Sequence, residues 1–130
     1  MKVQLSAKFE IEDWNESPLD DRSDVSKVTR AVVNKNYAGD IEGTSITEWL
    51  MAYLEDGSAE FVGMERISGS VGGQEGTLVL RHIGAYQGGA ARGVLQVVTG
   101  ASSGELRSAA GSGEFLADPS GSITLDLTEV

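Results

Sequence analysis

Apolar and polar side chains alternate residue by residue along most of this chain. In the first segment, Val3, Leu5, Ala7, Phe9 and Ile11 alternate with charged and polar residues. A period of two places successive side chains on opposite faces of a β-strand, whereas an amphipathic helix would repeat every ~3.6 residues. The pattern therefore predicts strands that each have one buried face and one face in water.

The strand pattern recurs between short turns down the length of the sequence. After residues 2–12, further strands are predicted at residues 25–37, 40–53, 59–71, 76–87, 93–99, 114–117 and 123–127. Turns such as Ala38-Gly39 are short enough to make neighbouring strands antiparallel. Two segments depart from the pattern, because residues 13–21 are predicted to form a polar loop and residues 103–110 a helical turn.

An antiparallel sheet of this size must fold into a sandwich or close into a barrel to remove its edges. Several predicted strands are long and contain internal glycines, which permit the bends that closure needs. These glycines are Gly43, Gly63, Gly69 and Gly84. We therefore predict a single all-β domain over residues 1–130, an antiparallel β-barrel with at most one short helix.

The charge of the chain narrows the possible function classes. Ten Lys and Arg residues against 20 Asp and Glu residues give a net charge of −10. Phosphate backbones and anionic membrane surfaces repel such a protein, so no nucleic-acid or membrane partner is expected. The absence of cysteine excludes a thiol nucleophile, a thiolate metal site and disulfides. With no apolar run of about 18 residues and no signal-peptide core, we expect a cytoplasmic protein.

The only histidine of the chain lies in the hairpin of residues 59–71 and 76–87. A two-residue turn of type II′ at Gly73-Gln74 would place Glu65 directly opposite His82. The remaining side chains on that face are mostly apolar, and we predict that this face is the barrel interior. Its larger apolar and aromatic members are Phe61, Ile67, Val71, Leu78, Leu80 and Tyr86.

Opposed side chains of this kind have Cβ atoms about 5 Å apart, so Glu65 and His82 are predicted to share a hydrogen bond. Burial raises a carboxyl pKa and lowers an imidazole pKa, while mutual attraction opposes both shifts. Such a pair can transfer protons or orient a ligand, or it can simply satisfy two buried polar groups. Metal ligation is a weaker interpretation because there is one histidine, and no metal or cofactor is predicted.

The second hairpin offers further polar candidates. A turn at Ala38-Gly39 would pair Lys35 with Glu42 across the two strands. The pair is either a solvated salt bridge or part of a polar wall beside Glu65 and His82, and the residues alone slightly favour solvent. Four aromatic side chains are candidates for a pocket wall or for ordinary core packing: Trp14, Tyr37, Trp49 and Tyr53.

Three blocks of the sequence resemble a bacterial domain-of-unknown-function family with an allene-oxide-cyclase-like β-barrel. The blocks are Gly39-Asp40-Ile41-Glu42-Gly43-Thr44-Ser45, the hairpin residues Phe61-Val62, Glu65-Arg66, Gly69, Gly73, Gly76 and His82-x-Gly84, and Gly104-Glu105-Leu106 with Gly111. The resemblance spans residues 25–130. It implies an eight-stranded antiparallel barrel, and it implies no established reaction.

The same resemblance groups charged positions that the hairpins alone leave apart. In the family pattern the positions matching Lys35, Glu42, Glu65 and His82 recur together, which implies one shared polar cluster. Many relatives end in a strand with a histidine and a tyrosine, whereas residues 121–125 have neither. The resemblance therefore implies a drier pocket here. The wider superfamily includes cyclases and isomerases that fold small hydrophobic substrates, although a shared fold does not transfer an activity.

Three functional hypotheses fit these residues. The first is a cofactor-free cyclase or isomerase for a small apolar metabolite, in which Glu65 and His82 are the catalytic acid–base pair. The second is a barrel that binds a small apolar ligand without chemistry, and the third is a filled barrel with a structural role. A cavity that reaches His82 would favour the first two. The candidate ligand-binding residues are Lys35, Glu42, Phe61, Leu80 and Tyr86.

The face opposite Glu65 and His82 carries an apolar patch of its own. It comprises Val62, Met64, Val79 and Ile83. If the Glu65 face is inside the barrel, this patch is outside, and contiguous exposed apolar patches usually mark contacts. We therefore predict a homo-oligomer, and specifically a dimer, that buries the patch.

Overall fold

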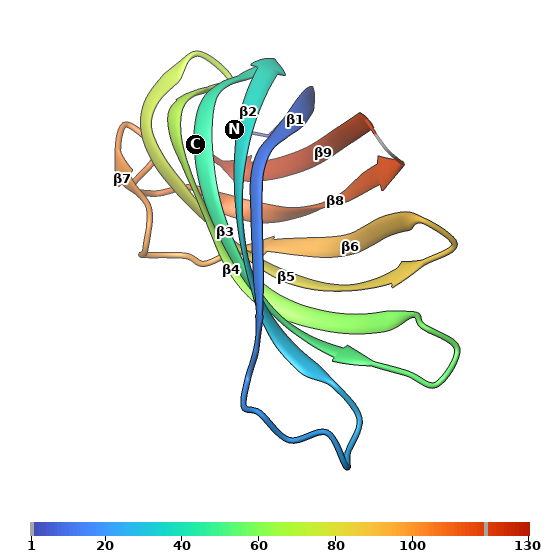
Figure 1. The fold of residues 1–130 in the computed structure, drawn as a ribbon. Coiled ribbons are helices and arrows are strands. Elements are labelled where there is room, and N and C mark those ends of the chain that lie inside the picture. Colours follow the sequence, from blue (N-terminus) through green and yellow to red (C-terminus); the bar gives the residue numbers. More distant parts are fainter. Residues whose placement is uncertain (1, 119) are drawn as a thin grey trace.

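The computed structural model describes residues 2–118 and 120–130. Its strands in chain order are β1 (Val3–Pro18), β2 (Val28–Gly39), β3 (Ile41–Tyr53), β4 (Ala59–Val71), β5 (Gln74–Gln87), β6 (Ala90–Val97), β7 (Ser103–Gly104), β8 (Ala110–Asp118) and β9 (Ser120–Glu129). Neighbouring strands pair antiparallel in the order β4-β3-β2-β1-β9-β8-β6-β5, and β4 also pairs with β5. The sheet is therefore a closed eight-stranded barrel (Figure 1), and the predicted fold class is confirmed.

Alternation within each strand decides which side chains fill the barrel. Along β3, for example, Ser45, Thr47, Trp49 and Met51 are buried and the residues between them are exposed. Closure pairs every long strand on both sides, so the sheet leaves no long edge open to other chains. One apolar core fills the interior, with contributions from all of the long strands.

Large rings inside the barrel lie over glycines on neighbouring strands. A Cβ atom at Gly63 would lie 2.7 Å from Trp49 Cδ1, and one at Gly84 would lie 2.6 Å from Phe61 Cζ. Gly93 would meet the ring of Phe115 at 2.7 Å in the same way. A side chain at any of these glycines would overlap the neighbouring ring. The glycines therefore make room for a layer of aromatic rings.

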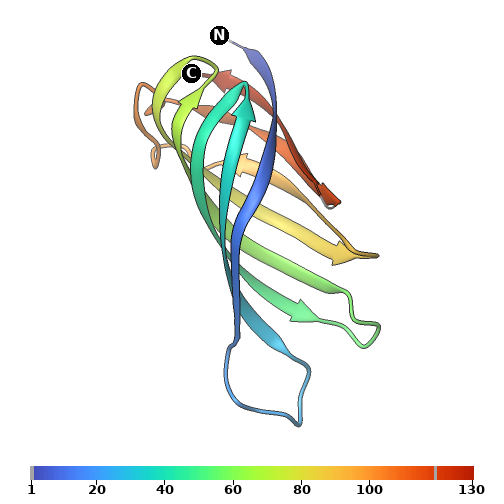
Figure 2. The same cartoon turned by 45° about the horizontal axis from the view of Figure 1, so that its top comes forward.

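The prediction of a polar loop at residues 13–21 is wrong for most of its length. Strand β1 continues to Pro18 after an irregularity at Ile11 and Asp13, and its end pairs with the start of β2. Figure 2 shows this β1–β2 hairpin projecting beyond the ends of the other strands. Residues 12–18 are all exposed and Trp14 is the one large apolar side chain among them, so the period-two signal is lost there. Glu16 joins the hairpin to β3 by accepting hydrogen bonds from Thr29 and Tyr53.

The predicted helical turn at residues 103–110 is also wrong. Ser103 and Gly104 form β7, which pairs with Gly76 and Thr77 of β5. The chain then makes a tight turn, and Leu106 N donates to Ser103 O at 3.2 Å. Leu106 and Ala109 are fully buried, so this turn anchors in the core. None of the described residues belongs to a helix with the length and apolarity that spanning a bilayer requires.

The turn between β4 and β5 lies one residue earlier than predicted. Val71 pairs with Gln74, so the turn residues are Gly72 and Gly73. Their φ angles of 58° and 82° are both positive, which is the signature of a type I′ turn and not of type II′. Glu65 therefore pairs with Leu80, and His82 pairs with Gly63. A two-residue shift keeps both side chains on the inner face.

The turn between β2 and β3 departs further from the prediction. Asp40 N donates to Ser6 O, and the Asp40 carboxylate accepts from Ser6 N, so Asp40 bonds to β1. The pairing between β2 and β3 ends at Tyr37 and Gly43, so more than two residues connect the paired positions, and Lys35 pairs with Ser45. The predicted pairing of Lys35 with Glu42 is wrong, because the three-residue difference places Glu42 on the outer face.

Candidate functional site

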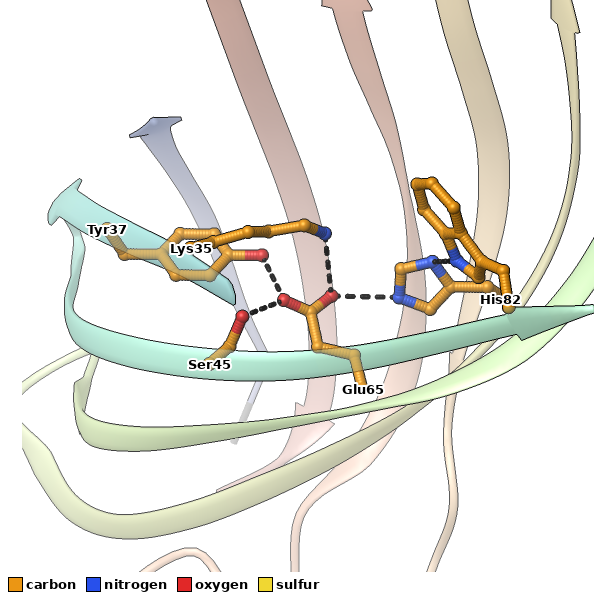
Figure 3. A network of polar contacts seen from close by, with 6 residues as sticks. Lys35, Tyr37, Ser45, Glu65 and His82 are labelled. Carbon is orange, nitrogen blue, oxygen red and sulfur yellow. Dashed lines mark hydrogen bonds and ion pairs between the residues drawn. The ribbon is translucent and has the colours of Figure 1, made fainter. Parts of the chain in front are cut away.

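The carboxylate of Glu65 is the centre of a buried polar network inside the barrel (Figure 3). Its Oε2 atom accepts hydrogen bonds from Tyr37 Oη and Ser45 Oγ, each at 2.6 Å. Its Oε1 atom accepts from His82 Nε2 at 2.8 Å and from Lys35 Nζ at 3.4 Å. The hydrogen bond predicted between Glu65 and His82 is thus present, and two hydroxyls that were not predicted complete the network.

Four adjacent strands bring these side chains together. Lys35 and Tyr37 point inward from β2, Ser45 from β3, Glu65 from β4 and His82 from β5. Lys35 and Ser45 are direct cross-strand partners, so a charged and a hydroxyl side chain approach Glu65 from the same side. The barrel register therefore surrounds the carboxylate with donors.

Trp49 determines the protonation of His82. The indole Nε1–H of Trp49 donates to His82 Nδ1 at 3.1 Å. An indole nitrogen can only donate, so Nδ1 carries a lone pair and the imidazole proton resides on Nε2. Nε2 in turn donates to Glu65. His82 is therefore a neutral imidazole whose tautomer and orientation are fixed from both sides.

Burial and neighbouring groups shift the pKa values of the network. Burial alone would raise the pKa of Glu65, but Lys35, His82 and Ser45 together hold it well below its usual range. Burial lowers the pKa of His82 and that of Lys35, although the Glu65 charge opposes both shifts. Burial also raises the pKa of Tyr37 well above 10.0. The network thus holds one carboxylate, one ammonium, a neutral imidazole and a phenol.

A cavity of about 160 Å³ lies beside the network, at the end of the barrel that holds the β5–β6 turn. Its described lining is Phe9, Ile11, Trp14, Lys35, Trp49, Tyr86, Gly89, Ala91, Phe115 and Ala117. Trp14 and Tyr86 of this lining are each 37% exposed, so part of the cavity wall lies at the protein surface. Of the described lining residues, Lys35 alone carries a charge.

The ammonium of Lys35 connects the network to this cavity. Its Nζ atom lies 4.7 Å from the ring centroid of Phe9, 5.4 Å from that of Phe115 and 5.5 Å from that of Trp49. These distances are those of cation–π contacts, which partly replace the water that burial removes. The ammonium donates to Glu65 and lies over these three rings, and Lys35 is also part of the cavity lining.

The matching family model is described as "Protein of unknown function (DUF3224)" and covers residues 5–128. The chain belongs to the DUF3224 family. Its fold is similar to the crystal structure of a protein with unknown function from the same family in Shewanella oneidensis MR-1. The two share 24% identity with a TM-score of 0.78, over 100% of this chain and 99% of that chain. No curated protein matches the chain.

The ligand-binding candidates inferred from the sequence divide into three groups in this DUF3224 barrel. Lys35 and Tyr86 line the cavity, and Lys35 also contacts Glu65. Phe61 and Leu80 are packed in the core. Glu42 lies on the outer face, so the single cluster implied by the resemblance forms without it.

Sequence analysis missed several cavity and network residues. Ser45 was missed because the predicted turn at Ala38-Gly39 placed its side chain on the face opposite to that of Lys35. Phe9 looked like an ordinary core residue of an alternating strand, and Phe115 lay in a segment whose strand pattern was short. The glycines beneath the rings, Gly93 and Gly121, are the signal that could have marked both phenylalanines. In the described part of the chain, no three His, Asp or Glu side chains gather as a metal site would require.

We expect the free energy of unfolding to decrease as the pH falls below about 6.5, the ordinary pKa of histidine. The folded pKa of His82 is lowered, so between the two pKa values the unfolded chain binds more protons. Stability is then lost with falling pH, by up to ~1.4 kcal/mol per pH unit. Below about 4.5, Glu65 adds a loss of the same sign because its folded pKa is also lowered. Urea unfolding at several pH values measures the slope.

The matched control for this slope is His82→Gln. The glutamine amide can donate to Glu65 and accept from Trp49, so it keeps both hydrogen bonds without titrating. Its stability should therefore fall less steeply than that of the natural protein between about pH 6.5 and 5. Parallel curves for the two proteins would contradict the assignment of a neutral, buried His82.

Proposed function

We propose that this barrel binds a small, neutral and mostly apolar molecule in the 160 Å³ cavity, and that Lys35 donates a hydrogen bond to an oxygen atom of that molecule. The observation that supports this proposal is the composition of the cavity wall. It consists of aromatic and alkyl side chains, and the Lys35 ammonium is the one charged donor among the described lining residues. Such walls are typical of small-molecule sites, in which a few polar groups fix orientation.

The size of the cavity limits the ligand to about one six-membered ring. An apolar protein cavity of roughly 150 Å³ accommodates benzene, whereas drug-sized ligands occupy cavities of roughly 300 Å³ or more. The rings of Trp49 and Phe115, whose planes are 14° apart, both line the cavity, and aromatic linings favour contact with another ring. The proposed ligand is therefore a single-ring compound or an open chain of similar volume.

The charge of the network favours a neutral ligand. Glu65 and Lys35 neutralise each other, and His82 is uncharged. An anion placed at Lys35 would leave the buried site with an excess negative charge, which costs several kcal/mol without a further partner. A cation would be repelled by the ammonium. A ketone or an aldehyde oxygen can accept a hydrogen bond from the Lys35 ammonium without changing the net charge of the site.

The geometry supports binding better than acid–base catalysis by Glu65 and His82. Both side chains lie behind Lys35 and Trp49, and neither is among the described residues that line the cavity. Each oxygen atom of the Glu65 carboxylate already accepts two hydrogen bonds, and His82 Nδ1 accepts from Trp49. A general base needs a free lone pair within reach of the substrate. In this proposal the pair instead positions Lys35.

Cyclohexanone is a suitable probe, and the two tryptophans are the reporters. Trp14 and Trp49 are the only tryptophans of the chain, and both line the cavity. We expect both indole N–H signals in ¹H–¹⁵N NMR spectra to shift saturably, with a Kd on the order of a millimolar. Toluene should also bind, and benzoate should bind more weakly than cyclohexanone.

The double variant Lys35→Met/Glu65→Gln tests the role of Lys35 without leaving an unpaired buried charge. It should weaken cyclohexanone binding by about tenfold or more, since the hydrogen bond to a charged donor is lost. Toluene makes no such bond and should bind the variant about as well as the natural protein. Indole signals that do not respond to either compound would contradict the proposal. Equal losses for the two compounds would contradict the role of Lys35.

A further inference from the structure

Lys35 is the one lysine of the chain that is buried. The other lysines are exposed at the surface: Lys2, Lys8 and Lys27. Lys35 Nζ lies 4.7–5.5 Å from the centroids of three aromatic rings, and all three rings line the 160 Å³ cavity together with Lys35. A molecule bound in the cavity therefore lies beside a primary amine, which is a nucleophile whenever it has lost its proton.

Lys35 is the most loosely held of the groups that contact the Glu65 carboxylate. The other three donors of the network lie 2.6–2.8 Å from the carboxylate oxygens, whereas Lys35 Nζ lies 3.4 Å away. A hydrogen bond between an ammonium and a carboxylate is usually ~2.7–2.9 Å long. Glu65 therefore keeps three close donors when the Lys35 nitrogen turns to a ligand, and the carboxylate remains beside that nitrogen as a proton acceptor.

Burial also makes the free amine of Lys35 more populated than that of an exposed lysine. An exposed lysine has a pKa of about 10.4, so roughly one side chain in 2,500 is a free amine at pH 7. Burial lowers the pKa of Lys35, and the Glu65 charge offsets only part of that shift. Lysines that are buried in this way serve as Schiff-base nucleophiles, because the amine is formed more readily at neutral pH.

We propose that Lys35 forms a reversible imine with the carbonyl carbon of a small aldehyde or ketone bound in the cavity. This step rests on the binding function proposed above, since the carbonyl group must first lie at Lys35. It adds a covalent bond to that function and restricts the natural ligands to small carbonyl compounds. The participants are the amine, the neighbouring carboxylate and the ligand itself.

The reaction conserves the charge of the site. One proton of the ammonium passes to Glu65, and the freed electron pair of Nζ forms a bond to the carbonyl carbon while the C=O π pair moves to oxygen. The oxygen takes up that proton and a second proton from nitrogen, and it leaves as water with the electron pair of the C–O bond. The pair left on nitrogen closes the C=N bond. The nitrogen keeps one proton as an iminium ion, and nothing is oxidised or reduced.

The surroundings of Lys35 suit an iminium ion as well as they suit an ammonium ion. Both ions carry one positive charge, so the ion pair with Glu65 and the contacts with the aromatic rings are retained. The wall of the cavity is mostly aromatic and alkyl, and a site that excludes water protects an imine against hydrolysis. The buried carboxylate thus keeps its countercharge throughout the cycle.

Reductive trapping with cyclohexanone and cyanoborohydride tests the covalent bond. Cyanoborohydride transfers a hydride to the iminium carbon and fixes a cyclohexyl group on the nitrogen, and peptide mass spectrometry then identifies the labelled lysine. We expect Lys35 to be labelled at least about tenfold faster than Lys8, which corresponds to a difference of one pKa unit in the fraction of free amine. Lys8 is exposed and serves as the internal control.

Oxygen exchange measures the same step without a reductant. Each round of imine formation and hydrolysis replaces the carbonyl oxygen by one from water, so ¹⁸O-labelled cyclohexanone should lose its label faster with the natural protein than in buffer. The variant Lys35→Met/Glu65→Gln should abolish this acceleration when it is compared at equal occupancy, with toluene binding as the check that its cavity is intact. The surface variant Lys8→Met should exchange oxygen as fast as the natural protein.

The outcomes distinguish the imine from simple binding. Indole signals that respond to cyclohexanone while Lys35 takes up no label, or while oxygen exchange is not accelerated, would overturn the imine and leave the binding function intact. Equal labelling of Lys35 and Lys8, or accelerated exchange that survives the loss of Lys35, would also overturn it. Indole signals that respond to none of the compounds would overturn both proposals.

Discussion

Replacing Lys35 by methionine will lower the free energy of unfolding by about 3–5 kcal/mol, because it removes the countercharge of a fully buried carboxylate. Lys35 and Glu65 are each 1% exposed, and their charged atoms lie 3.4 Å apart. Methionine matches the length of the side chain, so little volume is lost. The hydroxyl and imidazole donors that remain around Glu65 stabilise the anion less well than a formal positive charge does. Urea unfolding at neutral pH measures the change.

Two further variants separate the charge effect from packing. In the background of Lys35→Met, the change Glu65→Gln should recover part of the lost stability, since the buried site is then uncharged. The surface control is Lys8→Met on the outer face of β1, which should change stability by less than about 0.5 kcal/mol. A Lys35→Met protein as stable as the Lys8→Met protein would show that the buried ion pair is not a stabilising element.

Gly63→Ala is expected to destabilise the barrel by about 2–4 kcal/mol and to break the hydrogen bond between Trp49 and His82. Gly63 pairs with Trp49 on one side and with His82 on the other, so the Trp49–His82 bond passes over it. An added Cβ would lie 2.0 Å from the carbonyl oxygen of Glu48 and 2.7 Å from Trp49 Cδ1. Both distances are shorter than van der Waals contact allows, so the strands or the indole must move.

The position of the Trp49 indole signal provides a readout beyond stability. In the natural protein this N–H donates to an imidazole nitrogen, and in Gly63→Ala its resonance should move toward that of an unbonded indole. The control Gly57→Ala adds a Cβ that meets nothing within 4 Å and carries only the cost of a positive φ of 87°. An unchanged indole signal in a stable Gly63→Ala protein would contradict the role given to Gly63.

The contact between Glu65 and His82 was predictable from the sequence, although the predicted turn was one residue too late. Moving a two-residue turn by one position shifts the pairing by two residues, and the strand period is also two. His82 therefore stayed on the inner face even though its direct partner is Gly63 and not Glu65. The predicted contact survived because Glu and His side chains are long enough to meet diagonally across two strands.

The site of Lys35 was not predictable in the same way. The β2–β3 connection differs from a two-residue turn by an odd number of residues. Residues of β2 and β3 that were predicted to share a face therefore lie on opposite faces of the sheet. The difference arises from Asp40, which bonds to Ser6 and accepts a hydrogen bond from Gly72 N. Ser6 and Gly72 are distant in sequence, so neither contact leaves a signal in the local pattern.

The alternating pattern by itself determined that the chain forms antiparallel strands, and which side chains share a face within each strand, because both properties depend on neighbours one or two residues apart. The tertiary structure decided the register between strands, the closure of the barrel and the burial of Lys35. A lysine is stable inside a barrel only where a carboxylate meets it, and Glu65 is 30 residues away along the chain. The cavity likewise exists only because rings from distant strands meet around Lys35, which no single segment of the sequence specifies.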